Sequence, residues 1–251
     1  MIAVVALSAC SILQEPEEAS GPIEAVPLEV ESQEVPDESE ASEQTEEEPP
    51  MEEAEEAADE SAETELPAQG EGGGLVIFQI TPDGSEVRFE LDEELRGQPK
   101  TVVGATDQVA GEIAVDFSDL STAQAGILQI NARTLTTDND FRNRALNNQI
   151  LETGSFEFIT FTPTSVVGLP NSVSVGEMVS FSIVGDLTIR DVTNEATFTV
   201  EATPVSETQI TGSANTTVTR GDYGLQIPSV PNVANVEDEV ELYIDFTANA
   251  S

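Results

Sequence analysis

The side chains that most often carry out catalysis are nearly absent from this sequence. It has no histidine and one cysteine, Cys10, against 49 aspartates and glutamates. Without histidine, the common nucleophile–base pairs and zinc sites cannot be assembled. Carboxylates could form an acid–base pair of the kind that glycosidases use, but their abundance makes any single pair weak evidence. We therefore predict that the protein is not an enzyme.

One short acidic cluster resembles part of a metal site. Asp138, Asn139 and Asp140 match the start of a calcium loop. Such a loop also needs glycine at its sixth position and glutamate at its twelfth, and neither stands at that spacing. The alternative is a capping turn, with Asp140 as the N-cap of a helix. We favour the turn, and we predict no metal site and no cofactor.

The position of the cysteine suggests a different chemistry. The chain opens with an apolar run whose last three residues, Leu-Ser-Ala, directly precede Cys10. This run is too short to span a bilayer, which takes about 20 apolar residues. It resembles a bacterial lipobox at the end of a secretory signal. The resemblance implies an acylated Cys10 that anchors an extracytoplasmic protein to a bacterial membrane, in the periplasm or at the cell surface.

Cys10 has a second interpretation, and the residues before it depart from the usual signal pattern. The alternative is an idle or buried cysteine that follows a chance apolar start. A secretory signal also normally begins with lysine or arginine, and all eight basic residues of this chain lie at or after Arg88. We therefore expect the natural start to lie upstream of Met1.

The segment after the cysteine has the composition of a spacer. Residues 11–72 are rich in Glu, Pro, Ser and Ala, with few large apolar side chains to offset the entropy of ordering. We predict a disordered acidic linker between the signal, residues 1–10, and a folded domain, residues 73–251. A flexible coil of about 60 residues has a root-mean-square span of roughly 40–50 Å. The formal net charge of −41 excludes nucleic acid as a partner, and a cation-binding tail is the alternative to a plain spacer.

The remaining residues carry the period-two pattern of β-strands. Residues 239–247 are the clearest case, because Leu242, Ile244 and Phe246 share one face and acidic residues share the other. The expected strands are residues 75–80, 85–91, 108–117, 126–132, 157–167, 178–190, 196–202, 209–219 and 239–247. Only residues 141–150 have the pattern of a helix. About eight strands with one short helix predict an all-β, antiparallel barrel or sandwich. We favour the barrel, because long strands would otherwise leave exposed sheet edges.

Five segments in this domain resemble successive signatures of the YceI-like family. They are residues 136–142, 156–161, 185–193, 220–225 and 236–240. The resemblance covers roughly residues 74–250, in the family's order and spacing. It implies an extended, lipocalin-like antiparallel barrel whose apolar tunnel holds a polyisoprenoid, an isoprenoid quinone or another long amphiphile. The chain lacks the histidine–serine pair that many members carry near the first strands.

The expected ligand site is the interior of the barrel, because a closed barrel of about eight strands can enclose one narrow apolar ligand. For any single residue, ordinary core packing is the alternative. The lining candidates are Phe89, Leu128, Ile130, Phe141, Ile150, Phe158, Phe181, Ile183, Phe198, Leu242 and Ile244. Phe141 and Ile150 are expected to cover one mouth of the barrel as a lid.

Basic residues are scarce, so Arg142 and Arg144 on the expected helix are notable. Either could bind the polar head group of a ligand. The alternative, which we favour, is a salt bridge to Asp138, Asp140 or Glu152 that fixes the helix.

The sequence thus predicts a membrane-tethered binding or carrier protein for an isoprenoid-type lipid. The main alternative is an envelope adaptor whose packed barrel binds another protein, and a homodimer is a further option. An enzyme that acts on a bound lipid would need convergent polar groups at the base of the cavity.

Overall fold

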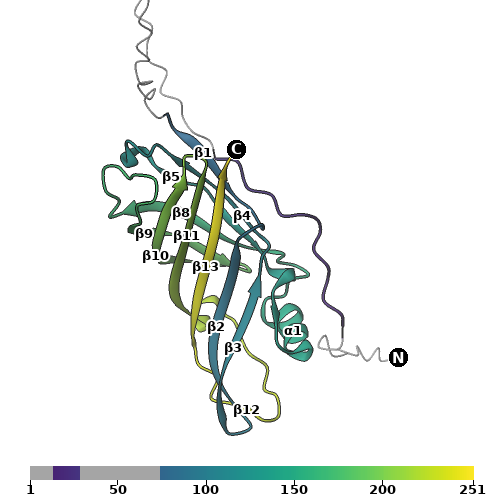
Figure 1. The fold of residues 1–251 in the computed structure, drawn as a ribbon. Coiled ribbons are helices and arrows are strands. Elements are labelled where there is room, and N and C mark those ends of the chain that lie inside the picture. Colours follow the sequence, from purple (N-terminus) through teal and green to yellow (C-terminus); the bar gives the residue numbers. More distant parts are fainter. Residues whose placement is uncertain (1–13, 29–73) are drawn as a thin grey trace, which may run out of the picture. The chain divides into compact units, whose positions relative to one another are not determined.

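The computed structural model describes residues 14–28 and 74–251. Cys10 and most of the predicted linker lie outside these residues. The described strands are β1 (Val76–Ile80), β2 (Glu86–Leu95), β3 (Gln98–Thr106), β4 (Val109–Val115), β5 (Gln124–Ala125), β6 (Leu128–Asn131), β7 (Thr136–Thr137), β8 (Phe158–Val167), β9 (Val179–Ile189), β10 (Val192–Ser206), β11 (Gln209–Thr219), β12 (Val233–Ala234) and β13 (Glu239–Ala250) (Figure 1). The helical segments are η2 (Leu120–Thr122), η3 (Ala132–Thr134), α1 (Asp140–Ala145), η4 (Leu146–Ile150) and η5 (Arg220–Tyr223). The predicted all-β fold class is confirmed.

Eight strands close into an antiparallel barrel, which also confirms the predicted architecture. Their order around the ring is β1-β4-β6-β8-β9-β10-β11-β13 and back to β1. β1 completes the ring because both of its edges are paired. Its Phe78 lies opposite Ile113 of β4 and opposite Ala250 of β13. Closure of this kind removes the exposed strand edges that an open sheet would leave.

β13 belongs to two parts of the barrel wall. Its last residues pair with β1, whereas residues 241–245 pair with β2. β2 turns into β3 through Arg96 and Gly97, whose φ angles of 55° and 75° fit a two-residue type I′ hairpin. The β2–β3 hairpin and β7 thereby extend the wall beyond the ring, on the side where α1 lies (Figure 1).

The sequence pattern did not predict β3, and Pro99 explains why. Proline cannot donate a ladder hydrogen bond and normally argues against a strand. Here it is the second residue of β3, opposite Glu94, in the part of the hairpin farthest from β7. The proline therefore lies near a strand end on the outer side of the sheet, where a missing donor is tolerated.

The helical segment is shorter and less regular than predicted. α1 ends at Ala145 and continues as the π-helical turn η4. Its N-cap is Asn139 rather than Asp140, because Asn139 Oδ1 accepts hydrogen bonds from the backbone N–H groups of Phe141 and Arg142. Within residues 14–28 and 74–251, no helix is long and apolar enough to cross a bilayer.

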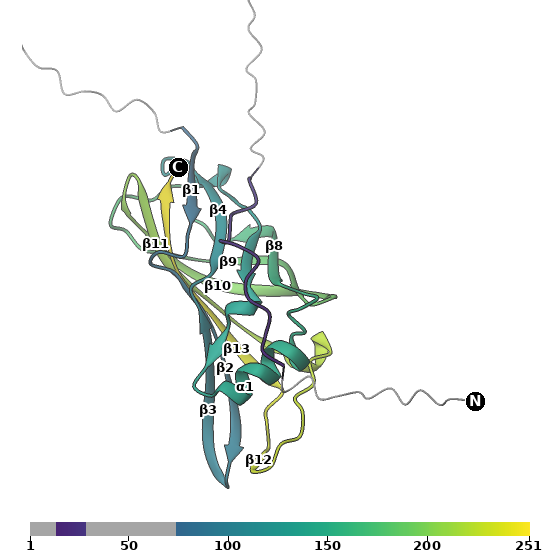
Figure 2. The ribbon, with the colours of Figure 1, turned by 90° about the vertical axis from the view of Figure 1, so that its right-hand side faces the viewer.

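Part of the predicted linker lies against the barrel. We call residues 14–28 the strap; it runs from the α1 side of the barrel toward the end where β1 begins (Figures 1 and 2). The one strap side chain classed as buried is Ile23, which is 9% exposed. Near one end, Asn148 of η4 donates to the Gln14 carbonyl, and near the other the Leu28 N–H donates to Glu112 of β4 at 2.6 Å. Composition predicted solvation throughout this segment, but the buried Ile23, a few half-buried apolar residues such as Leu28, and a few hydrogen bonds hold it on the surface.

Arg133 of η3 makes the central strap contacts. Its guanidinium lies 3.0 Å from the Glu17 carboxylate and 3.1 Å from Glu157, and it also donates to the Glu18 carbonyl. The Ser20 N–H donates to Glu157 at 2.8 Å. Burial acts to raise the pKa of Glu157, but these hydrogen bonds and the charge of Arg133 outweigh it and leave the pKa below its usual value. The ionised form of Glu157 is therefore the form that holds the strap.

The closure strand gives the first prediction. Phe78 is fully buried and packs on Phe117 with ring centroids 5.6 Å apart. We expect Phe78→Ala to lower the free energy of unfolding by about 3–5 kcal/mol. Phe141→Ala removes a ring that is 67% exposed, and it should change stability by less than about 0.5 kcal/mol in the unacylated protein. Urea unfolding of the full chain measures both, and equal effects would contradict the closure role of β1.

Candidate functional site

Three phenylalanine rings of the barrel interior lie directly over glycines. The ring of Phe89 covers Gly104, its register partner on β3, and a Cβ built on Gly104 would lie 2.3 Å from that ring. The same arrangement occurs at Phe246 over Gly212, at 2.6 Å, and at Phe161 over Gly185, at 2.7 Å. Since glycine has no side chain, each ring can lie flat against the wall instead of projecting across the barrel. The interior consequently keeps open space.

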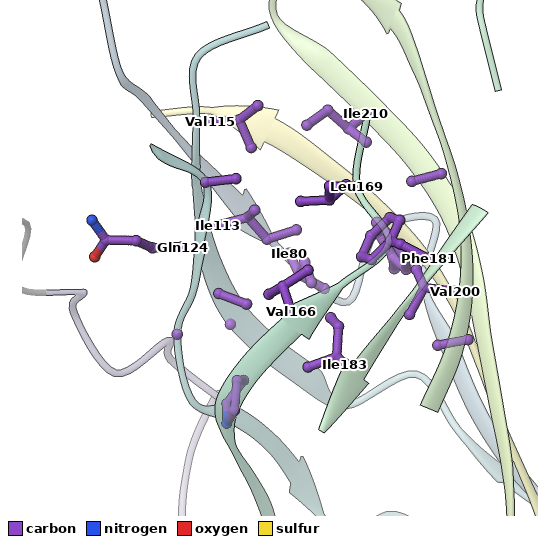
Figure 3. A pocket seen from close by; sticks show the side chains of 18 of the residues that line it. Ile80, Ile113, Val115, Gln124, Val166, Leu169, Phe181, Ile183, Val200 and Ile210 are labelled. Atoms are coloured by element: carbon purple, nitrogen blue, oxygen red, sulfur yellow. The ribbon is translucent and has the colours of Figure 1, made fainter. Parts of the chain in front are cut away.

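The first space, cavity 1, lies at the end of the barrel near the β8–β9 connection. It has a volume of about 150 Å³ and an almost entirely apolar lining. Figure 3 shows aliphatic and aromatic side chains from several strands converging on it, whereas the amide of Gln124 points away. Its lining includes Ile80, Ile113, Val115, Val166, Leu169, Phe181, Ile183, Val200 and Ile210. This cavity can hold hydrocarbon but offers almost nothing to a polar group.

The second space, cavity 2, lies at the α1 end and has a similar volume of about 150 Å³. α1 and η4 form one wall through Arg142, Leu146 and Ile150. Most of the remaining lining is also apolar, but Glu93, Arg220 and Tyr223 reach it. Cavity 2 is therefore the cavity with a polar side.

The charges at cavity 2 are already paired with one another. The Arg142 guanidinium lies 2.9 Å from the carboxylate of Glu93, whose side chain is 7% exposed, and it also bonds to Asp138. Hydrogen bonding from Lys100 holds the pKa of Asp138 below its usual value, and the charge of Arg142 acts in the same direction. Two cations thus face two carboxylates at this wall, and the group is electrically balanced.

Two further groups could offer hydrogen bonds in cavity 2. Burial raises the pKa of the Tyr223 phenol, and Asp222 adds to the effect, so the phenol is neutral at ordinary pH. Arg220 donates to the backbone carbonyls of Glu237 and Leu225. Together with Arg142, these groups suit a neutral polar group such as a hydroxyl or a carbonyl better than an anion.

The two cavities lie end to end, with cavity 1 inside the ring and cavity 2 where the β2–β3 hairpin and α1 extend its wall. On β8, Ile159 lines cavity 2 and Phe161 lines cavity 1; these are successive inward-facing positions. Leu242 and Ile244 divide in the same way on β13. Phe161 also packs edge-on against Phe198 at 4.8 Å, beside the boundary. An extended apolar chain that occupied both cavities would have to pass these rings.

The structure places most of the predicted lining residues at a cavity. Those at cavity 1 are Leu128, Phe181, Ile183, Phe198 and Ile244, and those at cavity 2 are Phe89, Ile150 and Leu242. Arg142 also lines cavity 2, where it makes the salt bridge to Asp138 that we had favoured as the alternative. That any of them binds a ligand stays a prediction.

Four predicted residues lie outside both cavities. Ile130 is buried in the barrel core. Phe158 is 36% exposed, because the inward positions of β8 are the odd-numbered ones, Ile159 and Phe161. Phe141 is 67% exposed, since the inner face of the helical segment is formed by other residues, and Arg144 lies near its ring on that outer side. The expectation that Ile130, Phe158 and Phe141 line the cavity is corrected, and Arg144, a head-group candidate, does not line either cavity.

Sequence reasoning missed the polar residues of cavity 2 other than Arg142. Arg220 and Tyr223 stand in one of the family-like segments, but they were not among the predicted site residues. The scarcity of basic residues was the available signal for Arg220. For Glu93 there was none, because it is one acid among many. Within residues 14–28 and 74–251, no group of three potential ligands is placed to hold a metal ion.

The folded domain is similar in sequence or in fold to several known proteins. A UPF0312 protein of Staphylococcus aureus is 34% identical over 158 residues, which cover 59% of this chain and 83% of that protein. A polyisoprenoid-binding domain from Saccharophagus degradans, implicated in plant cell wall breakdown, has a similar fold. Its TM-score is 0.55 at 17% identity, over 71% of this chain and 100% of that chain. Burkholderia cenocepacia BcnA has a TM-score of 0.53 at 15% identity, over 68% of this chain and 99% of that one.

The family model named "YceI-like domain" matches residues 78–248. This stretch contains every strand of the closed ring, although its limits fall within β1 and β13. The chain belongs to the YceI-like domain family.

Proposed function

We propose that the protein is a membrane-tethered, extracytoplasmic binding or carrier protein for an isoprenoid-type lipid, such as a quinone or a polyprenol. The observation that carries this proposal is the pair of apolar cavities, one inside the closed ring and one between the ring, the β2–β3 hairpin and α1. Pockets of this kind, lined by hydrocarbon with a few polar groups, are the usual form of a small-molecule site. A barrel packed throughout, as the adaptor alternative requires, would leave no such space.

The polar side of cavity 2 favours a ligand with one weakly polar end. The hydrocarbon part would lie along the apolar walls of both cavities, where each buried methylene contributes about 0.8 kcal/mol. The polar end would lie near Arg142, Arg220 and Tyr223. Since Arg142 already pairs with two carboxylates, a quinone carbonyl or a prenol hydroxyl fits better than a charged head group.

The isoprenoid class is supported by the relatives rather than by the cavity shape alone. The Saccharophagus degradans domain of the same fold is described as polyisoprenoid-binding. The membrane tether rests on Cys10 and the lipobox-like residues before it, and two acyl chains would hold the protein firmly at a membrane. Arg144 stays a head-group candidate only if the ligand extends out of cavity 2, and the homodimer stays a prediction.

Ligand uptake is the direct test. We expect the full chain carrying Cys10→Ser to bind one molecule of a menaquinone or of geranylgeraniol, because both combine an isoprenoid chain with a neutral polar end. Native mass spectrometry after incubation with each lipid would detect the added mass. Unchanged protein mass with both lipids would refute the carrier proposal and leave the adaptor as the better account.

A matched pair of variants on β10 tests whether cavity 1 holds the hydrocarbon. Val200 is 3% exposed and lines cavity 1, whereas Val205 on the same strand is 44% exposed. Val200→Phe should weaken lipid uptake about tenfold by filling the cavity. Val205→Phe should leave uptake unchanged. Titration by native mass spectrometry measures both, with circular dichroism to confirm folding, and equal affinities would exclude cavity 1 as the site.

A second pair tests the ring-over-glycine arrangement at cavity 2. A Cβ at Gly104 would meet side-chain atoms only, those of Phe89 and Thr137. Gly104→Ala should therefore preserve the fold but displace the Phe89 ring into cavity 2, and lower lipid affinity about tenfold. Gly74→Ala is the control, because a Cβ at Gly74 meets nothing within 4 Å. Retained affinity in Gly104→Ala would show that the ligand does not use cavity 2.

A further inference from the structure

The strap fixes where the amino-terminal part of the chain meets the barrel. Its first described residue, Gln14, accepts a hydrogen bond from Asn148 of η4 at 2.8 Å. η4 continues α1, and together they form a wall of cavity 2. With the strap in this place, the chain that leads back to Cys10 begins beside the helical wall of cavity 2 (Figure 2).

Covalent length then limits how far Cys10 can lie from that wall. Three residues lie between Cys10 and Gln14, and a fully extended chain covers at most about 14 Å over the four steps from one to the other. This inference rests on the proposed function, in which Cys10 carries the acyl chains. With Cys10 held at the membrane, the α1 side of the barrel is confined to the bilayer surface. The long acidic segment cannot relax this limit, because it lies on the other side of the strap.

The last residue of the strap and a residue of β1 donate to one carboxylate of the barrel. The Leu28 N–H donates to Glu112 at 2.6 Å, and the Gln79 side chain on β1 donates to the same carboxylate at 3.0 Å. Residues 29–73 follow the strap in the sequence. Their length adds nothing to the separation of Cys10 and the barrel while the strap is docked.

The outer side of α1 has the residue types of a membrane interface. Phe141 is 67% exposed, and the Arg144 guanidinium lies 5.8 Å from its ring. Arg144 has no carboxylate within ion-pair distance among the described residues. An exposed aromatic ring beside a basic group suits the head-group layer, where rings meet the acyl boundary and arginine meets phosphate.

We propose that the docked strap holds α1 against the phospholipid head groups of the membrane that anchors Cys10. Phe141 enters the interface, and Arg144 contacts lipid phosphate. Because Arg142, Leu146 and Ile150 line cavity 2 from the same helical segment, this placement brings the polar-sided cavity next to the bilayer. A lipid could then pass between the bilayer and cavity 2 with little exposure to water.

The test uses a property of the composition: the chain has no tryptophan and one cysteine. Purified protein is coupled through the Cys10 thiol to a maleimide phospholipid in phosphatidylcholine vesicles, so that the geometry is tested whether or not cells acylate Cys10. Phe141→Trp supplies a reporter on α1. Met178→Trp supplies one at the start of β9, about 35 Å along that strand from its cavity 2 end.

Brominated phosphatidylcholine quenches tryptophan only within the bilayer. The Phe141→Trp reporter should lose about half of its emission, as an interfacial ring would, and the Met178→Trp reporter should lose almost none. Equal quenching of the two reporters would overturn the inference, whereas flotation of natively produced protein with membranes tests the acyl anchor separately.

Strap variants test the cause of the placement. Glu17→Ala combined with Ile23→Ser removes the Arg133 ion pair and the buried strap side chain, and should reduce quenching at Phe141→Trp to the level of Met178→Trp. The control, Glu15→Ala with Glu24→Ala, removes two exposed carboxylates of the strap, and should leave quenching unchanged. Full quenching in the strap-release variant would show that α1 meets the bilayer without the strap and would refute the proposed role of the strap.

Discussion

The interior of this barrel depends on aromatic rings that rest on glycines of neighbouring strands. An eight-stranded barrel is narrow enough for its own side chains to fill. Glycine in a strand is normally unfavourable, since it contributes no packing. At Gly104, Gly185 and Gly212 a ring from another strand supplies that packing from above. The wall is thereby covered without a second layer of side chains, and the volume that such a layer would occupy becomes the two cavities.

The polar groups that face the interior are concentrated at cavity 2. The exposed lining of cavity 1 is almost entirely apolar, so a charge that faced it would be costly to desolvate. At cavity 2, Glu93 is nearly buried, but Arg142 neutralises it and is itself shared with Asp138. Removing one member would leave an uncompensated charge, which costs several kcal/mol. The ion pairs of Arg142 with Glu93 and Asp138 therefore fix α1 beside cavity 2. The interior is thus purely apolar at cavity 1 and weakly polar at cavity 2.

Sequence patterning sufficed for the all-β class, the single helical segment and most strands, because alternation is a local property. It failed where tertiary context decides. The pattern did not predict β3, because Pro99 argues against a strand. The missing backbone donor of Pro99 is tolerated only because it lies near a strand end. Phe158 was chosen in place of Ile159 because a one-residue error in phase exchanges the faces of a strand. The cavities themselves were not predictable from composition, since they depend on which ring meets which glycine across the sheet.

The strap was the least predictable part, because it is acidic and binds an acidic barrel. Coulomb forces between the two parts oppose the contact, so the attachment relies on backbone N–H groups that donate to barrel carboxylates, on Arg133, and on Ile23. Each of these is individually modest, which makes a docked strap reversible. Release of the strap would lengthen the chain between Cys10 and the barrel from a few residues to the whole acidic segment. That segment spans at most about 230 Å when fully extended. A segment with the composition of a passive spacer thus allows two separations of Cys10 and the barrel, a short one with the strap docked and a long one with it released. The small set of strap contacts selects between them.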